Sequence, residues 1–255
     1  MLFFFLVVAV VLFFLIRFMC KKPTVGPAYV PEKLSGNRPF AEQNKIKEIR
    51  GFYEALIACD PLNRFDPFRA RSGDAKLAAY EVFLTFKKMV KVCLSYGGYF
   101  RILSKLYLRT AEKTEVLEAV LIHESGIFVF KTMNCSGIIY GDILLHEWVQ
   151  VEEATSDDLF PETRFENPIS VVKAHVGALK FVLGEEVDCP SFVVFGDDCK
   201  LAGAPEGTFD CKVLHRQDLD SALVIELAKT QRYSVAQVDS LYEKLNSSMN
   251  LKGNG

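Results

Sequence analysis

The stretch from Thr114 to Gly141 constrains the fold more than any other part of the chain. Two apolar, β-rich runs, Thr114–His123 and Ile127–Met133, are separated only by the turn residues Glu124–Gly126. Two such runs around a short turn that contains glycine predict a β-hairpin. Because both runs are almost continuously apolar, we expect strands covered on both faces, as in an α/β sheet.

The rest of the chain mixes helical and strand patterns, which predicts an α/β domain with a mixed sheet flanked by helices. Further strands are predicted at 99–109, 138–140, 147–152, 191–195 and 212–214, with 138–140 and 147–152 forming a hairpin at the edge. Helices are predicted at 75–94, 168–183, 219–229 and 234–245, and a polar loop at 157–166. Pro168 suits a helix start because its missing N–H costs nothing there.

The first twenty residues, Met1–Cys20, are predominantly apolar, with Arg17 near their end. A helix of about 20 residues spans about 30 Å, the hydrocarbon thickness of a bilayer. No positive region precedes this run and no small-residue cleavage site follows it, which favours a retained transmembrane helix over a signal peptide. Lys21 and Lys22 favour a single-pass topology with the N-terminus outside and the remaining chain in the cytosol.

Three further segments surround the predicted α/β domain at 75–246. Residues 21–40 contain four prolines and are interpreted as a largely extended linker. Residues 41–74 are interpreted as an extension, with a helix over 41–59 that packs on the domain or lies on the membrane surface. Residues 247–255 are polar, and we expect a flexible tail.

Composition excludes little but weighs against a general nucleic-acid binder. The chain has 255 residues and a net charge of −2, which gives no overall attraction to nucleic acid. The cations that concentrate in one region are Lys87, Lys88, Lys91, Arg101, Lys105, Arg109 and Lys113. They are interpreted as solvated faces of a helix and its neighbouring strand, or as a phosphate-binding surface.

The seven cysteines include no Cys-x-x-Cys pair, so zinc-site spacing is absent. We expect reduced and mostly buried thiols, as in a cytosolic domain. Cys20 differs because it follows the predicted membrane helix and precedes two lysines, a position suited to S-palmitoylation.

An ordered set of short sequences carries a family resemblance. GIFVFKTMNCSGIIYG at 126–141 is followed by His146-Glu147-Trp148-Val149-Gln150, Phe165-Glu166-Asn167-Pro168-Ile169 and His175. In this order they resemble the NERD (nuclease-related domain) family, a branch of the restriction-endonuclease-like superfamily, over roughly Leu77 to Asn246. The resemblance implies a restriction-endonuclease-like mixed sheet flanked by helices and, in the family, metal-dependent nuclease chemistry.

The family's chemistry uses an acidic residue on one strand and a Glu-x-Lys motif on the next, which hold Mg²⁺ or Mn²⁺ and position the nucleophile. The resemblance places the acidic residue at Glu118, but Lys131-Thr132-Met133 stands at the Glu-x-Lys position. It also implies a site glutamate at Glu81 on the first core helix and a helix histidine at His175. The remaining metal ligands would be Glu81 and Glu118. The alternative interpretations are that Glu81 is an ordinary surface residue and that His175 is a helix histidine with a structural hydrogen bond.

Three readings of function follow. In the first, a membrane-anchored NERD-like domain has lost its catalysis, needs no cofactor and serves as a binding or scaffold module for an unidentified partner. In the second, it is a divergent nuclease on DNA or RNA, with Mg²⁺ or Mn²⁺ held by Glu81 and Glu118 and a positive group from Lys131. In the third, it is an unrelated membrane-anchored α/β protein.

One structural expectation tests the placement of this site. If the turn lies at Glu124–Gly126, then Glu118 and Lys131 point to the same side of neighbouring strands. A partly buried carboxylate without a metal ion needs a cation or hydrogen-bond donors. We therefore expect a Glu118–Lys131 ion pair with Met133 packed beside it.

Overall fold

The computed structural model describes residues 73–152, 161–202, 207–208 and 210–249. Within them the chain forms the α-helices α3 (Gly73–Tyr96), α4 (Pro168–Leu183), α5 (Leu219–Leu227) and α6 (Val235–Met249) and the 3₁₀ helix η2 (Arg216–Asp218). The strands are β1 (Phe100–Arg109), β2 (Thr114–His123), β3 (Gly126–Met133), β4 (Gly137–Tyr140), β5 (Glu147–Val151), β6 (Glu162–Glu166), β7 (Ser191–Phe195), β8 (Cys199–Leu201), β9 (Gly207–Thr208) and β10 (Cys211–His215).

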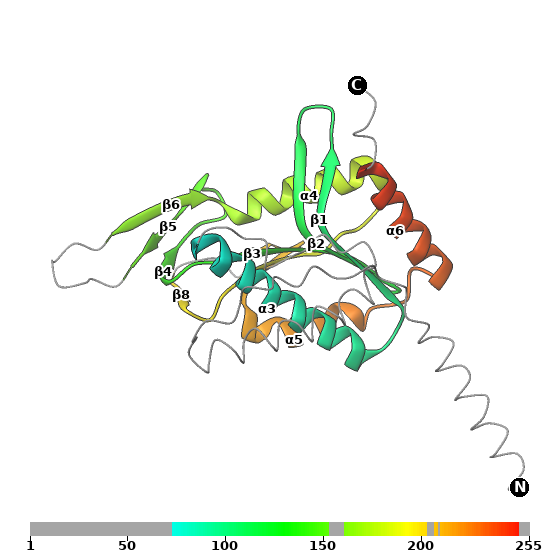
Figure 1. Cartoon of the computed structure of the whole chain (residues 1–255), viewed down its shortest axis with the longest axis horizontal. Helices are drawn as coiled ribbons and strands as arrows, with labels where there is room; N and C mark the ends of the chain where they lie inside the picture. The colour runs from blue at the N-terminus through cyan, green and yellow to red at the C-terminus, as the bar shows by residue number, and fades with distance from the viewer. Residues whose placement is uncertain (1–72, 153–160, 203–206, 209, 250–255) are drawn as a thin grey trace, which may run out of the picture. The chain divides into compact units, whose positions relative to one another are not determined.

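Six strands form one mixed sheet in the order β1-β2-β3-β7-β10-β9. Its first three strands are labelled in Figure 1. β1, β2 and β3 are an antiparallel meander, whereas β3, β7 and β10 run parallel. The predicted hairpin turn is confirmed, because His123 pairs with Gly126 and leaves Glu124 and Ser125 between the strands. His123 Nδ1 accepts a hydrogen bond from the Ser125 N–H at 3.0 Å, which fixes this turn locally.

Four strands form a second sheet in the order β6-β5-β4-β8, which corrects the prediction of one sheet. The β4–β5 hairpin is present, but it belongs to this second sheet and does not edge the first. β6 lies where part of a polar loop was predicted. Its side chains are mostly exposed, so its sequence lacks the apolar alternation of a half-buried strand. Trp148 of β5 stacks on Phe195 of β7 with ring centroids 6.1 Å apart, which joins the two sheets.

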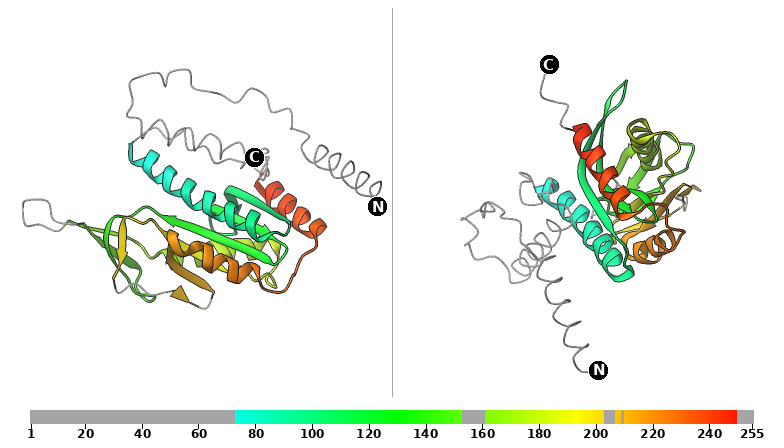
Figure 2. Two further views of the ribbon diagram at one scale, coloured as in Figure 1. Left: turned by 90° about the horizontal axis from the view of Figure 1, so that it is seen from below. Right: turned by 90° about the vertical axis from the view of Figure 1, so that its right-hand side faces the viewer.

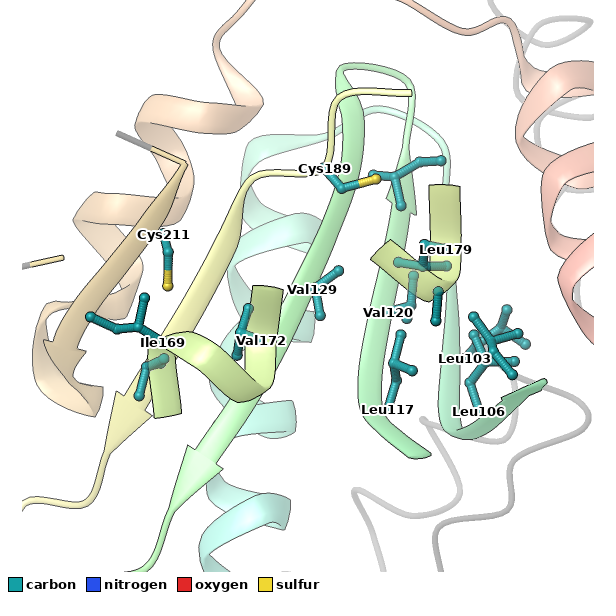
Figure 3. Packing of buried hydrophobic residues seen from close by; sticks show 14 of the residues in the cluster. Leu103, Leu106, Leu117, Val120, Val129, Ile169, Val172, Leu179, Cys189 and Cys211 are labelled. Atoms are coloured by element: carbon teal, nitrogen blue, oxygen red, sulfur yellow. The ribbon is translucent and has the colours of Figure 1, made fainter. Parts of the chain in front are cut away.

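Helices cover both faces of the six-stranded sheet (Figure 2). One apolar cluster lies between the sheet and α4 and α6, and a second lies between the sheet and α3 and α5. Figure 3 shows the first cluster, where Ile169, Val172 and Leu179 of α4 lie over strand residues that include Val129 and Val120. Burying each such side chain contributes roughly 1.5–3 kcal/mol. This two-sided burial explains the continuously apolar sequences of the central strands.

The most regular sequence patterns gave the most accurate predictions. The strand at 114–123 and the helix at 168–183 are confirmed to the residue. α3 is longer at both ends than its predicted range of 75–94, and α6 continues to Met249, into the predicted tail. β8 and β9 were not predicted, since strands of three and two residues carry no period that a sequence can show.

The predicted membrane helix, the linker and the helix at 41–59 lie outside the described residues. Within the residues that the structure does describe, no helix has both the length and the apolar character needed to cross a membrane.

Candidate functional site

Glu118 and Lys131 form an ion pair between the neighbouring strands β2 and β3. The register that pairs Ala119 with Phe130 sets these two residues opposite each other, and Lys131 Nζ donates to Glu118 Oε1. Glu118 Oε2 accepts a second hydrogen bond, from the Thr132 N–H at 2.8 Å. The predicted pair is thus confirmed, although about a quarter of each side chain is exposed (24% and 25%). Met133 is half-buried and packs against the core cluster beneath α4.

A backbone irregularity lies directly across from Glu118 on the edge strand. Ser104 pairs with Ala119 and Leu106 pairs with Leu117, which leaves Lys105 opposite Glu118. Lys105 has a φ of 48°, a left-handed conformation that is uncommon for a residue with a side chain. Leu103 and Leu106 are three residues apart, yet both belong to the cluster beneath α4. The regular alternation of side chains between the two faces of the sheet is therefore interrupted at Lys105. Such local departures from a regular ladder re-aim side chains and are frequent beside functional sites.

His175 of α4 is buried near this ion pair and stays neutral. Its Nε2 is 3.8 Å from Glu115 Oε2, which is too long for a hydrogen bond. Burial lowers the pKa of His175 to about 4; the Glu115 carboxylate opposes this effect, whereas Lys131 and Lys113 add to it. Its buried Nδ1 has no hydrogen-bond partner among the described residues. At neutral pH the imidazole is therefore uncharged and does not serve as a cation for Glu118.

Glu81 of α3 belongs to a different ion network, at the carboxyl ends of β7 and β10. Arg216 Nη1 donates to Glu81 Oε2, and Arg216 Nη2 donates to Asp197 Oδ2 at 2.6 Å. Burial would lower the pKa of Arg216, but its hydrogen bonds to Asp197 and Glu81 raise it overall. Gly196 permits this arrangement, because a Cβ there would lie 2.8 Å from Glu81 Oε2. Glu81 is thus a buried structural partner of arginine and is not the surface residue of the alternative reading.

The two predicted metal ligands are held by two different cations. Glu118 is paired with Lys131, and Glu81 is paired with Arg216. Among the described residues, no group of three His, Cys, Asp or Glu side chains is placed to hold one metal ion. The catalytic and metal-binding roles of Glu81, Glu118, Lys131 and His175 stay predictions.

A pocket of about 420 Å³ lies beside Asp197, between the second sheet and the end of β7. Its lining combines acidic, basic and small side chains: Ser136, Gly137, Ile138, Glu152, Asp197, Asp198, Cys199 and Lys200. Burial raises the pKa of Cys199 to about 11 and that of the neighbouring Cys135 to about 12, so both thiols are protonated at neutral pH. All five cysteines in the described residues are free thiols, as predicted, and four of them are buried.

Three residues of this region were not found by sequence reasoning. Arg216 and Asp197 are far from Glu81 in the chain, and nothing in their own neighbourhood indicates the contact. Glu115 is three residues from Glu118, so simple strand alternation puts the two on opposite faces. The irregularity across from Glu118 overrides that alternation, and both carboxylates reach groups near α4.

Comparison with known proteins finds a family for part of the chain. Residues 84–196 match the family described as Nuclease-related domain, NERD. The chain therefore carries a NERD domain. An uncharacterized protein of Bacillus anthracis is 25% identical over 119 residues, which cover 46% of this chain and 52% of that protein. The chain thus spans about half the length of this curated relative. No solved structure matches the chain.

The matched NERD region contains only one of the two ion networks completely. It runs from within α3 to the end of β7, so it includes Glu118, Lys131 and His175. Glu81 and Arg216 lie outside its two limits, although Asp197 follows its last residue directly. The expected family resemblance is therefore confirmed for residues 84–196, and the correspondence of Lys131-Thr132-Met133 to the Glu-x-Lys motif stays a prediction.

Proposed function

We propose that this chain is a membrane-tethered NERD domain that no longer cleaves nucleic acid and serves as a binding or scaffold module. The observation that carries the proposal is the Glu118–Lys131 ion pair. A lysine ammonium occupies the side of Glu118 where the family places a second metal-binding carboxylate, and repulsion by this cation disfavours a dication. The apolar Met133 stands where the family's lysine would position the nucleophile.

We also propose that the domain has the restriction-endonuclease-like fold. Its support is an α-helix followed by an antiparallel meander and then by a parallel strand inserted next to β3. The α4 helix and three strands of the second sheet, β4, β5 and β6, lie between β3 and β7 in the chain, and the implied site falls on β2 and β3. Fold alone does not decide activity, so the proposal rests on the replaced site residues.

Restoring the motif tests the loss of catalysis most directly. The purified chain is compared with a Lys131→Glu, Met133→Lys double variant and with a Lys131→Gln, Met133→Leu control. We expect weak Mn²⁺ binding and no cleavage of DNA or RNA from the natural chain and the control. The restored Glu-x-Lys motif is expected to bind Mn²⁺ at least tenfold more tightly, since a carboxylate replaces a repelling cation. Micromolar Mn²⁺ binding by the natural chain, with cleavage that Glu118→Ala abolishes, would establish the divergent nuclease instead.

Membrane tethering is proposed from the apolar run Met1–Cys20 and its flanking Lys21 and Lys22. We expect the full chain to resist carbonate extraction from membranes. We also expect protease added outside the cell to leave the NERD domain intact, because the domain lies on the cytosolic side. A soluble mature protein that begins after Cys20 would disprove this part of the proposal.

A further inference from the structure

The loop between β4 and β5 presents three consecutive apolar side chains to solvent. Ile143, Leu144 and Leu145 are 37%, 89% and 57% exposed. An isolated exposed leucine is ordinary on a protein surface, whereas contiguous apolar exposure marks interaction sites. We call the segment Asp142–Leu145 the apolar knob.

The side chain of Asn167 holds the backbone of the apolar knob. Asn167 is completely buried, and its Nδ2 donates to the carbonyl oxygens of Asp142 (3.2 Å), Ile143 (3.3 Å) and Leu145 (2.7 Å). Its Oδ1 accepts from the Ile169 N–H at 3.0 Å, which caps the start of α4. One buried amide therefore ties three backbone carbonyl groups of this loop to a helix end.

The core beneath the apolar knob fixes it from a second direction. The Trp148 indole N–H donates to the Asp142 carbonyl oxygen at 3.0 Å, and the same ring stacks on Phe195. Gly141 is required for this packing, since a Cβ there would lie 2.2 Å from the indole Cδ2. The Leu144 N–H donates to Asp142 Oδ1 at 2.8 Å, which completes the turn. Leucine is thus exposed on a loop whose conformation is set in advance, and such preorganisation lowers the entropy lost on binding.

Acidic side chains lie within the apolar knob and on the adjacent strands β5 and β6. Glu147 and Glu166 pair directly across β5 and β6, and both are exposed. Like charges in that position destabilise a sheet; Lys113 lies near Glu166 and offsets part of the repulsion, and a cation from a partner would relieve it further. Exposed Asp142 adds a third carboxylate beside Leu144. This charge disfavours the anionic surface of a cytosolic leaflet, which attracts basic segments.

We propose that the apolar knob is the docking element for a protein partner whose surface offers an apolar pocket rimmed by lysine or arginine. The inference deepens the proposed binding function and rests on it. Leu144 would fill the pocket, and Asp142, Glu147 and Glu166 would meet the basic rim. The arrangement resembles an interface hot spot, in which a few buried anchors carry most of the affinity.

The first experiment identifies what contacts the apolar knob in the cell. A photo-crosslinking amino acid replaces Leu144 in the full chain, and the control carries it at Phe181, which is 61% exposed on α4. We expect one discrete protein adduct from position 144 that position 181 does not give. Adducts with a second copy of the chain, adducts with lipid, or equal labelling from both positions would each overturn the proposal.

The second experiment tests the captured protein after it has been identified and purified. Leu144→Asp should weaken its binding to the full chain by roughly tenfold or more, whereas Phe181→Asp should not change it. Asn167→Asp keeps the oxygen that caps α4 but loses the donors that hold the loop. It should therefore increase amide exchange in 141–147 and weaken binding while Leu144 is still present. Added salt should weaken binding as well.

Binding unaffected by Leu144→Asp would overturn the proposal, as would binding that salt leaves unchanged. Leu144 is almost fully exposed, so this variant should unfold at the same denaturant concentration as the natural chain. The Mn²⁺ titration and cleavage assay test the proposed loss of catalysis separately. If the chain cleaves nucleic acid and its partner binding depends on the apolar knob, only the proposed loss of catalysis is refuted. If the chain does not cleave nucleic acid and its binding does not depend on the apolar knob, only the docking element is refuted.

Discussion

Two glutamates that the family resemblance assigns to one metal site have separate cation partners in this structure. Glu118 pairs with Lys131 from the adjacent strand, and 24% of its side chain is exposed. Glu81 pairs with Arg216, and only 9% and 11% of these two side chains are exposed. The first pair joins two neighbouring strands, whereas Arg216 also binds Asp197 and so connects α3 with the ends of β7 and β10.

The difference shows two ways in which a protein can compensate a carboxylate that is at least partly buried. A partly exposed carboxylate keeps water, so one flexible lysine and one backbone N–H are sufficient. A buried carboxylate requires more donors in fixed geometry, which the planar guanidinium of arginine supplies. We therefore expect the Glu81–Arg216 pair to matter mainly for stability, and the Glu118–Lys131 pair mainly for excluding a metal ion.

The largest effect is expected for Arg216→Met. This variant leaves two carboxylates beside each other, one of them buried, and should lower the free energy of unfolding by about 3–5 kcal/mol. Urea denaturation followed by circular dichroism measures the loss. Adding Glu81→Gln should recover part of it, because the buried negative charge is then removed. Equal stability of Arg216→Met and the natural chain would refute the stated role of this network.

The burial of His175 near the Glu118–Lys131 pair predicts how the stability of the fold depends on pH. Its pKa in the folded chain is about 4, below its ordinary value of 6.5, so the unfolded chain binds more protons between these values. The neutral imidazole thus favours folding above about pH 6.5, and the advantage is lost as the pH falls towards 4. We expect ~3 kcal/mol of stability to be lost over this window beyond the loss in His175→Gln. Parallel pH profiles of the two chains would contradict the burial of a neutral imidazole.

Lys131→Met should have a smaller effect than Arg216→Met, because the Glu118–Lys131 pair is partly exposed. We expect a loss of about 1–2 kcal/mol, between the values typical of exposed and buried pairs. Glu118→Gln with Lys131→Met should recover much of that loss, and denaturant melts of the single and double variants measure the coupling. Strictly additive effects would show that the two residues do not stabilise each other.

The smallest effect is expected for Lys113→Gln. Lys113 forms an ion pair with Glu115 at 2.7 Å, but 63% of its side chain is exposed to solvent. An exposed pair of this kind contributes little, so the midpoint of urea denaturation should not change. A clear loss of stability would mean that the Glu115 carboxylate depends on Lys113 and that the region beneath α4 is more tightly coupled than proposed.

Sequence patterns were sufficient where the structure is local. The strands on either side of Glu124 and Ser125 and the Glu118–Lys131 pair follow from one turn and from strand alternation. The contact between Glu81 and Arg216 spans 135 positions, and no local pattern specifies it. The second sheet was missed for a related reason: β8 pairs in parallel with β4, and β6 is too exposed to show alternation.

The place of β7 between β3 and β10 has a consequence for synthesis of the chain. The β1–β2–β3 meander contains only local pairings, and it can form as soon as Met133 has left the ribosome. β3 then presents Val129–Met133 as an open edge, because its partner, Ser191–Phe195, has not yet been made. Unpaired apolar edges of this kind are templates for aggregation. During translation, the strand that carries Lys131 is thus an aggregation-prone part of the nascent chain that a chaperone would protect.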